Sequence, residues 1–315
     1  MYLKNQDYSE NIRDNERGNM MFGLYFGTYL VEKNKLSMSQ FEDLMLQQQK
    51  TRVKLGFIAV SEKLLTTKQA EEINDIQRNM DRRFGDIAIE KGYLLAEEVT
   101  YLLNMQGNPY LQFVQVCTEN NIFTLQEIER YLEQFCQDNN FSETDLDALK
   151  SGDIDRIIPV FVNIDLPFSS DCISLSLRNM VRFIDSNIML KRAYPIQKYP
   201  FKALASQQIV GDHDIFVGLS GNDKALLQIA NSFAKENFST LDEDAYDAVC
   251  EFINCSNGLF ASKLSHEDIE IDMTPPMFYT NKNLISTGNI YIVPIIINNE
   301  TVDLLVATDN QIVID

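Results

Sequence analysis

The chain has 315 residues, enough for about two domains, and its hydrophobic content of 45% is ordinary for globular proteins. Its formal net charge of −19 excludes nucleic acid polymers and anionic membrane surfaces as bulk partners. Five cysteines without a Cys-x-x-Cys spacing favour reduced thiols in a cytoplasmic protein, and we expect neither a signal peptide nor a membrane-spanning segment.

Proline divides the chain into two parts. Only Pro109 occurs in residues 1–158, and the other seven prolines lie beyond. We therefore predict an α+β protein, in which an all-helical part precedes a mixed domain with an antiparallel sheet and long helices. The predicted boundaries are an N-terminal tail at 1–24, helical repeats at 25–136, a linker with one short helix at 137–156, and a second domain at 157–315.

The first part repeats with a period of 29 residues. Gly27, Gly56 and Gly85 share this spacing, and so do Gln48, Gln77 and Gln106. A fourth copy, FVQVCTENNIFTLQEIERYLEQF, keeps the apolar pattern but has neither the glycine nor the glutamine. Each copy predicts a short apolar helix, a turn and a second helix. Several such helix pairs can bury a core that one pair cannot.

The turns and the second helices carry local signals. The turns are predicted at Asn34, Lys63, Gly92 and Asn121. Capping boxes begin the second helix at Ser37, Thr66 and Thr124, whereas the third copy has Leu95 at this position.

These copies resemble the MshEN-type N-terminal domain of secretion ATPases, in which tandem copies bind cyclic di-GMP. The third copy matches best, with Arg83-Phe84-Gly85, then Gly92, then Gln106. The second has Lys54-Leu55-Gly56 and Gln77, with Lys63 at the turn. The resemblance implies a nucleotide site formed by Lys54, Gln77, Arg83 and Gln106. The alternative is a structural array whose glycines serve only close packing.

The apolar pattern of the second domain predicts alternating strands and helices. We expect a strand at 157–168, a helix at 170–190, two strands within 202–219 joined at Gly211-Asp212-His213, and a helix at 223–235. After a long helix at 242–264, strands are predicted at 269–273, 288–297 and 301–307. Asn298-Asn299 would turn the last hairpin.

The long helix at 242–264 has capping-box spacings at Ser239 and Thr240. Its predicted polar stripe consists of Asp247, Glu251, Asn254 and Gly258, within an arc of roughly 60°. The predicted apolar side consists of Ala248, Val249, Phe252, Ile253, Ser256, Leu259 and Phe260. A solvated polar face is the simplest interpretation of such a stripe.

The spacing Asp247-x3-Glu251-x2-Asn254, followed by Gly258 and by Pro275 or Pro276, resembles the signature of the chemotaxis phosphatases CheC, CheX and FliY. Because the signature occurs once, it resembles CheX more than CheC. The resemblance implies that Glu251 and Asn254 are catalytic and that Asp247 and Gly258 serve docking. It also implies a phosphorylated CheY-like receiver domain as substrate, Mg²⁺ brought by that receiver, and a homodimer paired through sheet edges.

Other chemistry has little support in the sequence. His213 and His266 lack a second ligand at metal spacing, so we predict no metal site and no cofactor of the protein's own. Gly218-x-x-Gly221 has no following Gly-Lys-Ser/Thr, and Cys250 and Cys255 lie within the long helix. Two hypotheses remain: a receiver phosphatase, and a non-catalytic sensor or scaffold that binds cyclic di-GMP or a receiver without hydrolysis.

Overall fold

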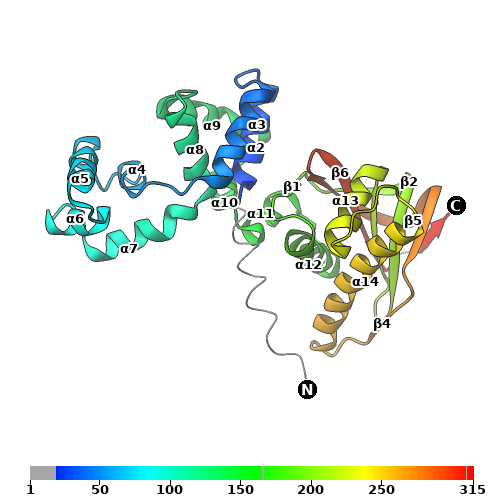
Figure 1. The fold of residues 1–315 in the computed structure, drawn as a ribbon. Helices are drawn as coiled ribbons and strands as arrows, with labels where there is room; N and C mark the ends of the chain where they lie inside the picture. The colour runs from blue at the N-terminus through cyan, green and yellow to red at the C-terminus, as the bar shows by residue number, and fades with distance from the viewer. Residues whose placement is uncertain (1–18, 165–166, 310) are drawn as a thin grey trace. The chain divides into compact units, whose positions relative to one another are not determined.

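A computed structural model describes residues 19–164, 167–309 and 311–315. The chain divides into two compact units, one up to Gly152 and one from Asp153 (Figure 1). The first is helical and the second combines helices with an antiparallel sheet, which confirms the predicted α+β class. Among the described residues, no helix is both long and apolar enough to cross a membrane.

From residue 19 onward, the first unit consists of four helix pairs and one further helix. The pairs are α2 (Met21–Glu32) with α3 (Met38–Lys50), α4 (Leu55–Ser61) with α5 (Thr67–Met80), α6 (Phe84–Glu90) with α7 (Ala96–Asn104) and the short 3₁₀ helix η1 (Met105–Gly107), and α8 (Pro109–Glu119) with α9 (Leu125–Asn139). Each pair corresponds to one copy of the 29-residue repeat.

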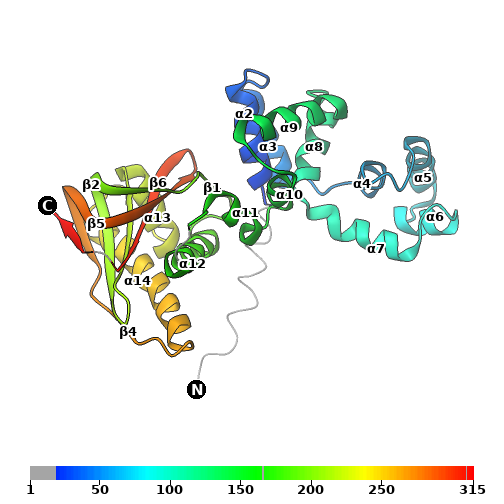
Figure 2. The same ribbon diagram turned by 180° about the vertical axis from the view of Figure 1, so that it is seen from behind.

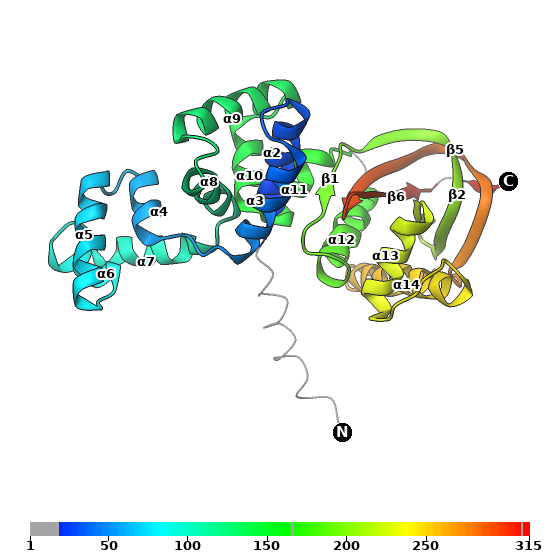
Figure 3. The ribbon, with the colours of Figure 1, turned by 45° about the horizontal axis from the view of Figure 1, so that its top comes forward.

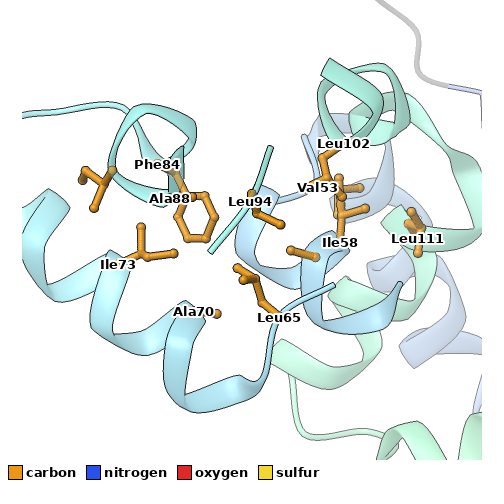
Figure 4. Close-up of a cluster of buried hydrophobic side chains, with 12 residues drawn as sticks. Val53, Ile58, Leu65, Ala70, Ile73, Phe84, Ala88, Leu94, Leu102 and Leu111 are labelled. Atoms are coloured by element: carbon orange, nitrogen blue, oxygen red, sulfur yellow. The ribbon is translucent and has the colours of Figure 1, made fainter. Parts of the chain in front are cut away.

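The four copies do not stack in chain order. Helices α2 and α3 of the first copy contact α8 of the fourth, while α4 and α5 of the second copy contact α6 and α7 of the third. Figure 2 shows the same two groups from behind. A shared apolar core joins the second copy to the third (Figure 4). Its buried residues are Val53, Ile58, Ala59, Leu65, Ala70, Ile73, Phe84, Ile87, Ala88, Leu94, Leu102 and Leu111.

The local signals of the repeat are confirmed. Asn34, Lys63, Gly92 and Asn121 all have left-handed backbone, with φ of 55°, 59°, 67° and 53°. Ser37, Thr66 and Thr124 form complete capping boxes. The third copy keeps half of the box, because the Glu98 carboxylate accepts a hydrogen bond from the Leu95 backbone N–H at 2.7 Å.

The glycine at the start of a copy lets its two helices approach closely. A Cβ atom at Gly85 would lie 2.6 Å from Val99 Cγ1, and one at Gly27 would lie 2.4 Å from the Phe41 ring. Val99 and Phe41 occupy equivalent positions on the second helices, 58 residues apart. Packing alone therefore accounts for these two glycines.

Two expectations at the ends of this unit are corrected. The segment 137–156 is folded rather than a linker: it holds the end of α9, helix α10 (Glu143–Ser151) with buried Ala148 and Leu149, and the start of α11. Residues 1–18 of the expected tail lie outside the described residues, but α2 already begins at Met21. The side chains of Met21 and Phe22 are buried, which explains why the helix extends into the expected tail.

The second unit holds four helices and seven strands among its described residues. They are α11 (Ile154–Phe161), α12 (Pro167–Phe183), β1 (Met189–Leu190), β2 (Tyr194–Gly211), β3 (Ile215–Gly221), α13 (Asp223–Ala234), α14 (Glu243–Ser265), β4 (Ile271–Met273), β5 (Met277–Ile297), β6 (Glu300–Thr308) and β7 (Ile312–Ile314).

The strand predicted at 157–168 is wrong. Its first residues form α11, because Asp153 caps that helix by accepting from the Asp155 N–H, and Ile157, Ile158 and Phe161 are buried on one side of it. The helix predicted at 170–190 ends earlier, at Phe183, and Met189–Leu190 form β1. The β5 strand begins well before the expected residue 288, at Met277.

The sheet curls back on itself. Antiparallel pairs β2–β3, β3–β6, β6–β5 and β5–β2 form a closed circuit, which is possible because β2 and β5 are long enough to have different partners along their lengths. Figure 3 shows β2 and β5 bowed in this way. The residues inside the bend form their own apolar cluster: Phe201, Leu204, Phe216, Leu284, Ile290, Ile292, Leu305 and Ala307.

Helices α12, α13 and α14 pack against one another and on the sheet, as Figures 1 and 2 show. Ile215 to Ser220 of β3 are all buried, because one face of the strand meets the helices and the other faces the inner cluster. Asn298 and Asn299, with φ of 46° and 69°, form the predicted turn between β5 and β6. This frame fixes α14, the helix with the predicted polar stripe.

Candidate functional site

Helix α14 is held by its cap and by its buried side. Asp242 caps the helix, since its carboxylate accepts from the Ala245 N–H at 3.2 Å, so neither Ser239 nor Thr240 is the cap. The buried side chains are Ala245, Val249, Cys250, Phe252, Ile253, Ser256, Asn257, Phe260 and Leu264. The predicted apolar side is thus correct except at two positions: Leu259 is 44% exposed and Ala248 is half-buried.

The predicted polar stripe faces outward. Asp247 and Glu251 are exposed, and Asn254 and Gly258 are half-buried. Asn254 Nδ2 lies 3.4 Å from Glu251 Oε2, so the amide and the carboxylate are neighbours on one face. Within the described part of the chain, neither Asp247 nor Glu251 forms an ion pair. The stripe therefore offers negative charge and one amide to a partner.

A buried glutamine stands behind Asn254. Gln207 of β2 is only 2% exposed, and its Nε2 donates to Asn254 Oδ1 and to the Thr274 carbonyl oxygen, each at 2.8 Å. Its Oε1 accepts from Asn257 Nδ2 at 2.9 Å. The half-buried amide of Asn254 is therefore anchored to the sheet rather than free to rotate.

Gly258 has no packing reason to be a glycine. A Cβ atom there would meet only the Met273 Cε atom, at an ordinary contact distance of 3.7 Å. Glycine inside a helix is less stable than alanine by about 1 kcal/mol. Close packing within the described part of the chain does not offset this cost, which fits a surface that another molecule approaches closely.

Cys250, which lies near the stripe, is not suited to nucleophilic attack. Burial raises the pKa of the Cys250 thiol to about 11, and the negative charge of Asp247 adds to the rise. A thiol with so high a pKa is protonated at neutral pH, whereas a cysteine nucleophile needs its thiolate. Across the residues that the structure describes, no group of three or more metal-ligating side chains converges.

The four residues predicted to bind a nucleotide line a single cavity in the first unit. Lys54, Gln77, Arg83 and Gln106 all face this space of about 820 Å³ between the second and third copies. Because Lys54 and Arg83 are 29 residues apart, as are Gln77 and Gln106, the cavity has equivalent residues from both copies. Gln106 also donates to the Val53 carbonyl oxygen at 2.8 Å.

The cavity is rich in positive charge. Arg52, Lys54, Arg78 and Arg83 line it, against one acidic residue, Asp86. Lys54 forms an ion pair with Glu119 at 2.7 Å and Arg78 a longer one with Asp75 at 3.4 Å. Among the described residues, Arg83 has no ion-pair partner. The first and fourth copies lack this arrangement, since Gln48 is fully buried and donates to the Pro109 carbonyl.

The sequence analysis missed Gln207, Asn257 and Thr274. Asn257 falls on the buried side of α14, yet it was not assigned to either face. The available signal was the polar run Ser206-Gln207-Gln208, which lies between the apolar residues 203–205 and 209–210. Only the pairing of β2 with its neighbours decides that the first of these glutamines points inward.

Comparison with known proteins finds a family match within the second unit. Residues 203–297 match the family described as "Chemotaxis phosphatase CheX". A search of curated proteins finds no match. The chain is similar to a solved CheC-like superfamily protein from Shewanella sp. PV-4, with 18% identity, coverage of 46% of this chain and 99% of the other, and a TM-score of 0.41.

Two further solved structures are similar over the same share of the chain. One is the chemotaxis protein CheX from Vibrio vulnificus, with 14% identity, coverage of 45% and 99%, and a TM-score of 0.40. The other is a CheX–CheY–BeF3–Mg²⁺ complex from Borrelia burgdorferi, with 17% identity, coverage of 44% and 94%, and a TM-score of 0.36.

The second unit is thus an α+β domain that presents a carboxylate and an amide on the outer face of a long helix. Its residues 203–297, which include the whole of α14, match the model of the CheX family of chemotaxis phosphatases.

Proposed function

We propose that the second unit removes the phosphoryl group from the aspartyl phosphate of a CheY-like receiver domain. The family match at 203–297 supports the class of reaction. The observation that carries the proposal is that Glu251 and Asn254 lie 3.4 Å apart on the outer face of α14, while Glu251 forms no ion pair among the described residues.

The reaction is a hydrolysis that requires few chemical groups from this protein. Water attacks the phosphorus atom, and the bond from phosphorus to the aspartyl oxygen breaks with its electron pair going to the carboxylate. Both hydrogens of the water leave with inorganic phosphate, as H2PO4⁻. Such transfers depend mostly on positioning and charge stabilisation, and the receiver contributes its own Mg²⁺ and lysine.

Each residue of the stripe has a distinct role in this proposal. The Asn254 amide contacts the attacking water and a phosphoryl oxygen, because an amide both accepts and donates hydrogen bonds. Glu251 pairs with the receiver's lysine and so brings α14 into its site. Asp247 extends the acidic docking surface, and Gly258 allows close approach.

The test is the release of inorganic phosphate from a panel of phosphorylated receiver domains. Asn254→Ala should abolish turnover but retain binding to a receiver held in its phosphorylated form by BeF3⁻. Glu251→Ala should weaken that binding as well. Glu267→Ala, at an exposed glutamate just beyond α14, is the matched control. Native turnover by Asn254→Ala would refute the mechanism.

A second function is favoured by the cavity in the repeats: binding of cyclic di-GMP between the second and third copies. Its volume of about 820 Å³ suits a ligand of that size. The positive charge of Arg52, Lys54 and Arg83 suits its two phosphates, and the equivalent residues from two copies suit its two equal halves. Gln77 and Gln106 would contact the guanine edges.

Calorimetry with cyclic di-GMP tests this second function. Binding should be lost in Arg83→Ala, and retained in Arg130→Ala, an exposed arginine on α9 outside the cavity. Absence of heat at high micromolar ligand with folded protein would leave the repeats as a structural array, whose glycines serve packing.

A further inference from the structure

We infer, resting on the phosphatase function proposed above, that Gln207 is a positioning residue which turns the Asn254 amide nitrogen outward, toward the phosphorylated partner. Gln207 comes from β2, on the sheet behind α14, and does not reach the exposed face itself. It acts through the amide that it holds.

One carbonyl group fixes the orientation of three amides. The Thr274 backbone oxygen can only accept, so the Gln207 atom 2.8 Å from it must be Nε2. Gln207 Oε1 then faces Asn257, whose Nδ2 donates to it at 2.9 Å. The second hydrogen of Gln207 Nε2 is left for Asn254, so the Asn254 atom at 2.8 Å must be the acceptor Oδ1.

Burial makes this orientation the preferred one. Gln207 is 2% exposed and Asn257 is 1% exposed, so neither can exchange its partners for water. Turning the Asn254 amide over would place its NH₂ group against the NH₂ group of Gln207. Two donors would then face each other without an acceptor, which buried polar groups avoid.

The outward group of Asn254 is therefore Nδ2, next to Glu251 Oε2 at 3.4 Å. Its hydrogens are donors for the oxygen atoms of an incoming phosphoryl group, where negative charge must be stabilised. The bond from Gln207 occupies one lone pair of Oδ1 and leaves the other for water. Without Gln207, the Asn254 amide would be free to rotate. Its Oδ1 would then face the phosphoryl oxygen atoms, which it cannot stabilise.

Two substitutions and one control test the role of Gln207. Gln207→Met removes both donors at similar volume. Gln207→Glu replaces the donor that faces Asn254 with an oxygen atom, so Asn254 should turn its NH₂ group inward. Gln208→Met is the matched control, since Gln208 is the next residue of the same strand and is exposed.

The first measurement is nuclear magnetic resonance of the side-chain amides, with the Asn254 signals assigned by their loss in Asn254→Asp. In the native protein the Asn254 NH₂ hydrogens should exchange quickly with solvent, and those of Gln207 slowly. In Gln207→Glu the Asn254 signals should shift and their exchange should slow. Unchanged Asn254 signals in Gln207→Glu would overturn the inference.

The second measurement is turnover of a phosphorylated receiver. Gln207→Met and Gln207→Glu should lower kcat by about tenfold to a hundredfold, with KM within about twofold of the native value. A kcat equal to that of Gln208→Met would also overturn the inference. The two proposals can fail separately. If the native protein turns over no receiver but the Asn254 signals change in Gln207→Glu as expected, the phosphatase function is wrong and the positioning of Asn254 by Gln207 is retained.

Discussion

Gln106 donates from Nε2 to the backbone carbonyl of Val53, 2.8 Å away, and so ties the third copy of the repeat to the start of the second. Gln48, at the equivalent position of the first copy, donates to the Pro109 carbonyl at the start of the fourth copy, at 3.1 Å. At two of its three positions the recurring glutamine thus links copies, and these links follow the pairing of first with fourth and second with third.

These links should differ in strength because they differ in burial. Gln48 is fully buried, so Gln48→Ala removes a buried hydrogen bond to the Pro109 carbonyl and opens a cavity. We expect it to lower the free energy of unfolding by about 2–4 kcal/mol. Gln106→Ala, at a half-buried site, should cost about 1 kcal/mol. Urea denaturation of both variants gives the comparison, and equal losses would contradict the role of burial.

The turn of the third copy should accept asparagine better than alanine. Gly92 has φ of +67°, and nothing lies within 4 Å of a Cβ atom placed there, so backbone strain alone decides the outcome. Asn34 and Asn121 occupy the same position in other copies. Gly92→Ala should cost about 1–2 kcal/mol and Gly92→Asn less, as measured by the shift in unfolding midpoint. A reversed order would show that this position is not limited by its φ angle.

Gly258→Ala should separate stability from binding. Alanine improves the helix and meets only Met273 at 3.7 Å, so the free energy of unfolding should rise by up to about 1 kcal/mol. The added methyl group lies on the proposed docking face, so affinity for a BeF3⁻-activated receiver should fall. Thermal unfolding and calorimetry provide the two readings. A variant that is more stable and binds equally well would remove Gly258 from the docking surface.

The half-buried carboxyl of Asp303 should make stability depend on pH. Burial raises the pKa of Asp303, although Tyr199 donates to it at 2.6 Å and partly opposes the rise. Because the folded pKa lies above the unfolded one, the carboxyl favours folding at low pH, and this contribution is lost as the pH rises through the folded pKa. Asp303→Asn should therefore be more stable than the native protein at pH 7, with the difference fading toward pH 3.

The matched control for this variant is Asp43→Asn on α3, because Asp43 is exposed. It removes one negative charge from the same acidic chain without changing a buried carboxyl. If Asp43→Asn gave the same gain at pH 7, the cause would be net charge and not the burial of Asp303.

The local structure of this protein can be predicted from residues that are close together in the chain. Left-handed turns at Asn34 and Gly92, the capping boxes at Ser37 and Thr66, and the polar stripe of α14 depend on neighbours a few residues apart. Interactions of that range can be inferred from spacing, because helix periodicity and turn chemistry hold wherever the segment lies in the fold.

Interactions between distant segments depend instead on how the folded elements pack. The pairing of the repeat copies depends on which apolar faces meet, and all four copies have the same apolar pattern. The apolar run at Ile157 and Ile158 suits a strand by composition, yet it forms α11, since burial against neighbouring elements outweighs intrinsic preference. Gln207 lies 47 residues from Asn254 in the chain. Their contact exists because sheet pairing turns Gln207 inward beneath α14, and no local pattern encodes that.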